Sequence, residues 1–322
     1  MPQIGYALSS EEHAPLDIVR NAGLAEKAGF DFLSISDHFH PWIDAQGHSG
    51  FVWSLIGGIA ATTSRIRLGT GVTCPTIRTH PAIIAHAAAT AACLMPGRFF
   101  LGIGSGENLN EHILGDRWPE VEVRLEMMEE AVEVIRTLWQ GGVQSHRGRH
   151  YTVENARIYD LPDELPPIVV SASGPKATEV AGRIADGLWG MSPDQDLVKR
   201  FDELAGPGKP RYAQVTLCYG KDAAAARRTA HQIWPTAGIK GEASQELPSP
   251  KHFEQLAGMV SEDQIAESVP CGPDPAPVLE QVRTYVEAGF DQVYFHQIGP
   301  DQQGFIDWAK RELLPAARRL TS

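Results

Sequence analysis

The sequence predicts an α/β fold of the (β/α)₈ barrel (TIM barrel) type, and three observations support this prediction. Eight short apolar runs of strand length alternate with stretches whose apolar residues recur at helical spacing. Four of these runs precede residue 104 and four follow it, which favours a closed barrel over a doubly wound open sheet. The 322 residues, 43% of them hydrophobic, suit a single barrel domain over residues 1–322.

Each predicted element follows from a local pattern. The predicted strands are residues 3–7, 31–35, 66–71, 98–103, 167–172, 187–190, 211–218 and 292–296. The predicted helices are residues 16–28, 51–63, 81–94, 121–139, 175–185, 277–288 and 303–320. Pro81 favours the start of a helix, and Gly141 with Gly142 favours the end of another. The helix over 121–139 has one apolar stripe, made of Val121, Leu125, Met128, Val132, Ile135 and Trp139.

Two connections are long, residues 104–166 after the fourth strand and residues 219–273 after the seventh. The first contains a small strand-like excursion at 146–153, and the second carries many Pro, Gly and Ser residues. Long connections within a compact domain are usually lids or binding loops. We therefore expect inserted segments at both places to serve a binding site.

Composition limits the expected partners. The net charge of -12 argues against a broad surface for nucleic acid or an anionic membrane. The start of the sequence has no signal-peptide pattern, and no run of about 18 apolar residues occurs, so we expect a cytoplasmic protein without a membrane span. The four cysteines form no CxxC pair, which argues against a zinc ribbon or a dithiol redox centre. We expect a small-molecule substrate as the partner.

Residues that carry chemistry follow five of the predicted strands. In a barrel the active site lies at the C-terminal ends of the strands. The residues there are Asp37, His38, His40 and Trp42 after the second strand, Gly71, Val72 and Cys74 at the third, Gly106, Glu107 and Asn110 after the fourth, Ser173 and Gly174 after the fifth, and His296 at the eighth. We expect them to converge on one mouth of the barrel.

His38 is the candidate general base, because an imidazole takes up a proton near neutral pH. Asp37 would hold its tautomer or bind a ligand, and the alternative is that both residues cap the following loop. Together with His40 and His48, His38 also allows a barrel metallohydrolase. The fifth and sixth strands end in poor metal ligands, so we predict no metal.

Two glycine-bearing segments each allow two interpretations. The run GIGSGE (102–107) lets backbone approach a flat ligand but fits a dinucleotide fingerprint poorly. Glu107 either caps a short helix that begins near Leu109 or acts as an acid that faces a ring system. The run SASGPKA (171–177) leads into a helix whose first N–H groups suit a cofactor phosphate, and the alternative is an ordinary turn.

Five segments together resemble one family: SDHFHPW (36–42), LGTGV (68–72), LGIGSGENLNE (101–111), IVVSASGP (168–175) and VYFH (293–296). They are similar, in this order, to the luciferase-like, coenzyme F420-dependent oxidoreductases, and most to the F420-dependent glucose-6-phosphate dehydrogenase group. The resemblance implies a homodimeric dehydrogenase or reductase that transfers hydride between a substrate alcohol carbon and the 8-hydroxy-5-deazaflavin ring. The alternatives are an FMN-dependent luciferase-like monooxygenase and a non-catalytic coenzyme carrier.

The resemblance also implies residue roles. His38 would take the hydroxyl proton, Trp42 and Glu107 would flank the ring, and Glu11 would lie near His38. The cofactor-binding residues would be Asp37, Gly71, Val72, Cys74, Gly106, Asn110, Ser173 and Gly174, with a non-proline cis peptide at Gly71–Val72 and the phosphate on Ser173 and Gly174. We expect His38 and Glu107 to bracket one flat heterocycle at the barrel rim.

The chain departs from the sugar-phosphate members, which hold the substrate phosphate with basic residues. The matching positions are Met191, Ser192, Pro193, Asp194, Ser244, Glu267 and Ser268. A phosphate dianion without a cation in a buried pocket binds poorly. Lys240 and Lys251 are the basic residues near these positions in the sequence. We predict an uncharged substrate (a neutral alcohol, an unphosphorylated sugar or a ketone) and not glucose 6-phosphate.

Overall fold

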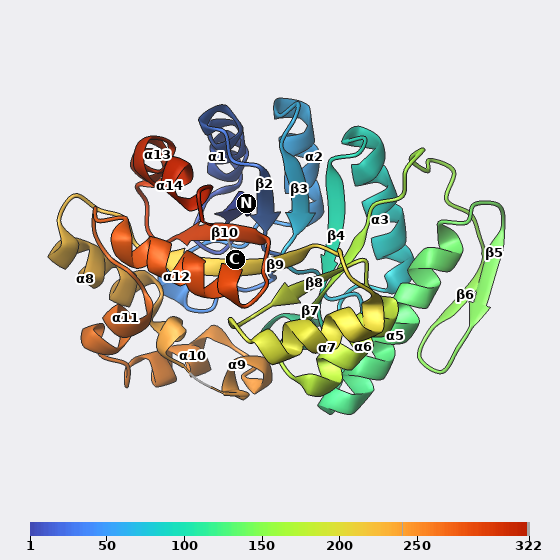
Figure 1. Cartoon of the computed structure of the whole chain (residues 1–322). Helices are drawn as coiled ribbons and strands as arrows, with labels where there is room; N and C mark the ends of the chain where they lie inside the picture. Colours follow the sequence, from blue (N-terminus) through green and yellow to red (C-terminus); the bar gives the residue numbers. More distant parts are fainter. Residues whose placement is uncertain (240, 321–322) are drawn as a thin grey trace.

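The structure is a computed structural model that describes residues 1–239 and 241–320. Eight parallel strands close into a barrel in the order β1-β10-β9-β8-β7-β4-β3-β2, with helices around it (Figure 1). These strands are β1 (Gln3–Leu8), β2 (Phe32–Ile35), β3 (Arg67–Thr70), β4 (Phe99–Ile103), β7 (Ile168–Ala172), β8 (Gly187–Gly190), β9 (Arg211–Leu217) and β10 (Gln292–Gln297). The predicted fold class is confirmed.

The helices cover the barrel and one of its ends. They are α1 (Pro15–Ala28), α2 (Val52–Thr62), α3 (Pro81–Leu94), α4 (Asn108–Glu111), α5 (Val121–Leu138), α6 (Pro175–Ile184), α7 (Gln195–Ala205), α8 (Ala223–Ile233), α9 (Ala243–Glu246), α10 (Pro250–Ala257), α11 (Glu262–Ser268), α12 (Ala276–Glu287), α13 (Gln302–Trp308) and α14 (Leu314–Ala317). Short single-turn helices span Asp44–Gln46, His112–Leu114, Pro235–Gly238 and Ala309–Leu313. In the part of the chain that the structure describes, no helix combines the length and apolarity needed to cross a bilayer.

The two long connections differ in their place in the fold. The first contains α4, α5 and an antiparallel hairpin of β5 (Gln144–Arg147) and β6 (Thr152–Ala156), which stands beside α5 away from the barrel (Figure 1). The second forms α8, α9, α10 and α11, which gather along one end of the barrel (Figure 1). The sequence predicted this second segment only as a long connection.

Several predicted details need correction. The second long connection contains helices that were not predicted, although capping signals mark two of them. Helix α10 begins at Pro250, and Ser261 with Gln264 forms a capping box at the start of α11. Helix α7, capped by Asp194, was not predicted. The helix predicted at 303–320 is interrupted by a π-helical turn between α13 and α14. Val121 is exposed at the first turn of α5 and does not belong to its buried stripe.

The barrel interior is filled by large aromatic rings beside glycines. Phe32, Phe100 and Trp189 belong to one buried cluster inside the barrel. A Cβ atom at Gly5 would lie 2.5 Å from the Phe32 ring, and one at Gly69 would overlap the Phe100 ring. Glycine is therefore required at both positions by the close approach of the rings. This packing closes the barrel interior and leaves the C-terminal strand ends as the place for a cavity.

Candidate active site

One cavity of about 730 Å³ lies at the C-terminal ends of the barrel strands. The predicted site residues that line it are Glu11, Asp37, His38, Trp42, Gly71, Val72, Cys74, Gly106, Glu107, Asn110 and Ser173. Gly174, the remaining predicted site residue, is the N-cap of α6 and does not line the cavity. The strand ends thus converge on one mouth, as the barrel topology predicts.

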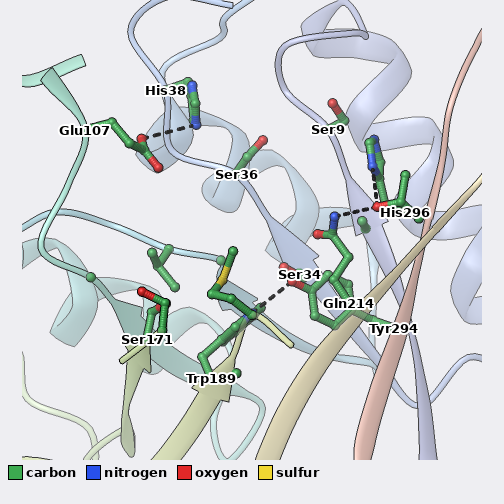
Figure 2. A pocket seen from close by; sticks show the side chains of 18 of the residues that line it. Ser9, Ser34, Ser36, His38, Glu107, Ser171, Trp189, Gln214, Tyr294 and His296 are labelled. Atoms are coloured by element: carbon green, nitrogen blue, oxygen red, sulfur yellow. Dashed lines mark hydrogen bonds and ion pairs between the residues drawn. The ribbon is translucent and has the colours of Figure 1, made fainter. Parts of the chain in front are cut away.

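The second long connection also lines the cavity. Its contribution is Trp234, Ala237, Gln245, Ser268 and Val269, from the ends of α8 and α11 and from the short helices between them. The expectation that this connection serves a binding site is consistent with that position. Figure 2 shows how the strand-end side chains face the same space.

His38 follows β2, and both of its ring nitrogens have protein neighbours. Its Nε2 lies 3.3 Å from Glu11 Oε1 and 3.8 Å from Glu107 Oε2. Its Nδ1 lies 3.1 Å from the His40 carbonyl oxygen and 3.1 Å from Asn110 Nδ2. The ring of Trp42 packs against the imidazole at a centroid distance of 5.0 Å. The imidazole is therefore held in one place at the cavity wall.

The orientation of the Asn110 side-chain amide determines which of its atoms faces His38 Nδ1. The Asn110 Oδ1 accepts hydrogen bonds from the backbone N–H groups of Phe39 and His40, at 2.9 and 3.2 Å, so its Nδ2 points toward His38 and Glu107. In one tautomer, His38 Nδ1–H donates to the His40 carbonyl and Nε2 is left to accept a proton. In the other tautomer, Nδ1 accepts from Asn110. The first tautomer is the one that a general base needs.

Glu11 is an ionised partner for that imidazole. Burial raises the pKa of Glu11, but the charge of His38 and a hydrogen bond from Ser36 Oγ at 2.5 Å outweigh it, and the pKa is lowered overall. Ser9 Oγ donates a second hydrogen bond to the Glu11 carboxylate at 3.1 Å. The carboxylate that the resemblance places near His38 thus carries a negative charge at neutral pH.

Glu107 occupies the N-cap position of α4, but its side chain accepts no capping hydrogen bond from the backbone N–H groups of that helix. Its Oε2 instead accepts a hydrogen bond from Asn110 Nδ2 at 3.2 Å and faces His38. Of the two interpretations of Glu107, the geometry favours the carboxylate that faces the site.

The expectation that His38 and Glu107 bracket a flat ring is wrong in its geometry. At 3.8 Å the two side chains are direct neighbours, and no ring fits between them. They lie side by side on one wall of the cavity (Figure 2). A flat ligand must therefore approach this pair from one side.

Asp37 has partners that the sequence did not indicate. Arg78 Nη2 lies 2.9 Å from Asp37 Oδ1, and Thr73 Oγ1 donates to Asp37 Oδ2 at 2.8 Å. The same arginine lies 3.4 Å from Glu111 Oε1. Burial raises the pKa of Glu111 to about 7, although Arg78 opposes the shift. No local pattern marks Arg78, because its partners lie more than 30 residues away in the sequence.

The backbone behind these side chains carries the predicted cis peptide bond between Gly71 and Val72. Gly106 has a φ of 82°, and a Cβ atom there would lie 2.6 Å from Cys74 Sγ, so glycine is required. Burial raises the pKa of the Cys74 thiol well above its ordinary value, which keeps the thiol neutral.

The remaining histidines after β2 point elsewhere. His40 Nδ1 contacts the Leu109 carbonyl oxygen at 2.9 Å, and the side chain of His48 is exposed. Residues 1–239 and 241–320 contain no group of three or more His, Cys, Asp or Glu side chains placed to hold a metal ion.

A second histidine lines the cavity on its far side. His296 Nε2 lies 2.8 Å from Glu12 Oε1, and both side chains are buried. The sequence places His296 at a strand end without indicating a role, and no motif marks Glu12. The adjacent residues Glu11 and Glu12 thus each pair with a different histidine.

The fold and the site define a barrel enzyme of one known family. A family model described as luciferase-like monooxygenase matches residues 1–292, and the chain belongs to this family. The protein is therefore an oxidoreductase.

Individual relatives narrow the comparison. The F420-dependent glucose-6-phosphate dehydrogenase of Beutenbergia cavernae is 36% identical, over 99% of this chain and 98% of the relative. The enzyme of the same name from Microbacterium testaceum is 35% identical, over 98% of both chains. A solved structure, an F420-dependent secondary alcohol dehydrogenase in complex with an F420-acetone adduct, matches with a TM-score of 0.90 and 31% identity, over 98% of this chain and 99% of the other.

Proposed function

We propose that the protein is a coenzyme F420-dependent dehydrogenase or reductase that interconverts an uncharged alcohol and its carbonyl compound. The observation that carries the proposal is the imidazole of His38, held at the wall of a large cavity with Nε2 next to two carboxylates. The similarity to F420-dependent dehydrogenases over nearly the whole chain supports the choice of coenzyme.

The cavity fits the coenzyme. Its volume of about 730 Å³ lies within the range of about 300–1,000 Å³ that is usual for ligand sites. Gly71, Val72, Asn110 and Gly106 would line the ring, with Asp37 and Cys74 beside them. The first N–H groups of α6, next to Ser173, have no partner within the helix and suit a phosphate. When bound, the deazaflavin accepts or returns a hydride.

His38 supplies the proton transfer that alcohol oxidation requires. As the hydride leaves the alcohol carbon, the hydroxyl proton moves to His38 Nε2, and the carbonyl compound remains. The negative charge of Glu11 stabilises the imidazolium that forms. In the direction of reduction the same nitrogen returns the proton. Glu107 and Trp42 confine the reacting group beside the imidazole.

The charge of the cavity favours an uncharged substrate. Glu11, Asp37, Glu107 and Glu111 line it, and no lysine or arginine of the described residues does. Lys251 is exposed on α10, and Lys240 lies outside the described residues. A phosphate dianion would meet no lysine or arginine side chain among the described residues that line the cavity. We therefore infer that the substrate is not a sugar phosphate, although the relatives are named for glucose 6-phosphate.

The test is anaerobic incubation of the protein with oxidised F420 and a panel of propan-2-ol, D-glucose and glucose 6-phosphate. We expect reduction of F420 by an uncharged compound. Turnover of glucose 6-phosphate with micromolar KM would contradict the inference about charge. Tight binding of FMN together with a requirement for oxygen would favour the monooxygenase alternative.

We further infer a homodimer. Large apolar side chains are exposed at the starts of α1, α2 and α3, namely Leu16, Phe51 and Ile83. Helix α1 packs against α2, and α2 packs against α3. Exposed apolar side chains at the same ends of adjacent helices suit a protein contact surface. Sedimentation equilibrium is expected to give twice the chain mass, and the mass of a single chain would contradict the inference.

A further inference from the structure

The pair of His296 and Glu12 has no part in the proton transfer proposed above. Glu12 Oε1 lies 2.8 Å from His296 Nε2, and Glu12 Oε2 accepts a hydrogen bond from the Gly299 backbone at 2.9 Å. Both carboxylate oxygens of Glu12 therefore have a partner within the protein. Glu12 holds one ring nitrogen of His296, and the role of the pair depends on what the other ring nitrogen faces in the cavity.

Strand register places polar side chains beside His296. In β9 and β10, Gln214 is opposite Tyr294 and Thr216 is opposite His296. Alternate residues of a strand face the same side, so all four side chains point into the barrel, as Tyr212 does in the interior cluster. Each of them lines the cavity. Figure 2 shows His296 and Gln214 across the cavity from His38 and Glu107.

The hydrogen bonds of this group are between uncharged atoms. Gln214 Nε2 donates to Thr216 Oγ1 at 2.9 Å, and Thr216 Oγ1 lies 3.5 Å from His296 Nδ1. Glu12 occupies Nε2 of His296, so Nδ1 is the ring nitrogen that a ligand hydroxyl can reach. The long contact to Nδ1 is weak, so a ligand hydroxyl competes for it with little loss. Gln214 Oε1 is a further acceptor.

The surroundings disfavour an anion at this position. Glu12 lies directly behind His296, and Glu11 is its neighbour in the chain. The ring of Trp234 packs edge-on against His296 at a centroid distance of 4.5 Å and forms an apolar wall. A hydroxyl group satisfies these acceptors and the Thr216 hydroxyl without bringing negative charge near Glu12.

We propose that His296, Thr216 and Gln214 form a second subsite, which hydrogen-bonds a substrate hydroxyl remote from the carbon that gives up hydride. The substrate is then an uncharged polyhydroxylated compound, of the class of unphosphorylated sugars, rather than a simple alcohol or ketone. This inference rests on the proposed function, because the subsite lies in the same cavity as His38.

The experiment compares kcat/KM for D-glucose and propan-2-ol, with F420 as coenzyme, in wild type and in two variants of one residue. Thr216→Val keeps the shape of the side chain and removes the hydroxyl, and Thr216→Ser restores the hydroxyl. We expect wild type to prefer D-glucose. Thr216→Val should lower the ratio of the two kcat/KM values about fivefold, the usual worth of one hydrogen bond between uncharged groups. Thr216→Ser should keep the ratio near that of wild type.

Three results would overturn the subsite: equal use of the two compounds, turnover of neither while F420 binds, or a ratio that Thr216→Val leaves unchanged. A ratio that falls equally in Thr216→Ser would indicate a packing defect instead of a lost hydroxyl and would also contradict it. Quenching of F420 fluorescence on binding is measured in parallel. Failure of wild type to bind F420 would refute the proposed function itself, so the two failures are distinguishable.

Discussion

Glu11 and Glu12 are adjacent in the chain, and each pairs with a histidine of the same cavity, but the two pairs differ in what their imidazoles face. His38 Nε2 is directed at two carboxylates, Glu11 and Glu107, at 3.3 and 3.8 Å. His296 Nε2 is directed at Glu12 alone, at 2.8 Å, and its Nδ1 faces Thr216.

The difference separates an imidazole placed for the proposed proton transfer from one placed for hydrogen bonding to a ligand. Negative charge on two sides stabilises the imidazolium form of His38, which general base catalysis produces. The shorter single contact of His296 instead engages one ring nitrogen with Glu12 and leaves the other for a hydrogen bond to a ligand. The same two residue types therefore suit proton transfer in one place and recognition in the other.

The largest effect expected is that of removing the base. His38→Asn should lower kcat about a thousandfold, because proton transfer by a positioned side chain contributes about 10²–10⁴ in rate. His296→Asn should lower kcat/KM for D-glucose only about tenfold, mainly through KM. Steady-state kinetics with F420 measures both. An equal loss of kcat in the two variants would break the comparison between the two pairs.

The two neighbouring carboxylates give a matched second test. Glu11→Gln should lower kcat about tenfold to a hundredfold, because it removes the charge that stabilises the His38 imidazolium. Glu12→Gln keeps an acceptor for His296 and should raise KM about threefold with a smaller change in kcat. The split between kcat and KM is the readout. If Glu11→Gln acted only on KM, Glu11 would not stabilise the imidazolium that forms on His38.

Glu111, another carboxyl that lines the cavity, sharpens the comparison through stability. The folded pKa of Glu111, about 7, lies above its ordinary value of 4.5. The stabilisation that this shift provides is present below pH 4.5 and is lost as pH rises through 7. Relative to Glu111→Gln, wild type should lose about 2 kcal/mol of unfolding free energy between about pH 5 and about pH 7.

Urea unfolding at both pH values measures this difference. Glu11 has a lowered pKa, so its contribution has the opposite sign, present above its ordinary pKa and lost on acidification. A difference between wild type and Glu111→Gln that does not depend on pH would contradict the assignment of Glu111.

The site residues that could be predicted are those marked by a pattern in the nearby sequence. His38, Trp42, Glu107 and Asn110 were predicted, because each directly follows a strand whose pattern is legible in the local sequence. Arg78 was missed, because nothing near it in the sequence indicates that it bridges two carboxylates.

The second long connection shows the same limit in the fold. Its short helices α9, α10 and α11 have too few turns for an apolar stripe to be recognised, and only their capping residues mark them. Their position over the cavity depends on contacts with distant segments, such as the T-shaped packing of Phe253 against Trp42.

The sequence by itself determined the barrel and the end of it that bears the chemistry, because strand and helix periodicity and strand-end position are local properties of the chain. Only the tertiary structure decided which carboxylate meets which histidine, that His38 and Glu107 share one wall, and that Thr216 stands opposite His296. Those facts depend on strand register and on side-chain contacts between residues far apart in the sequence, which barrel closure alone brings together.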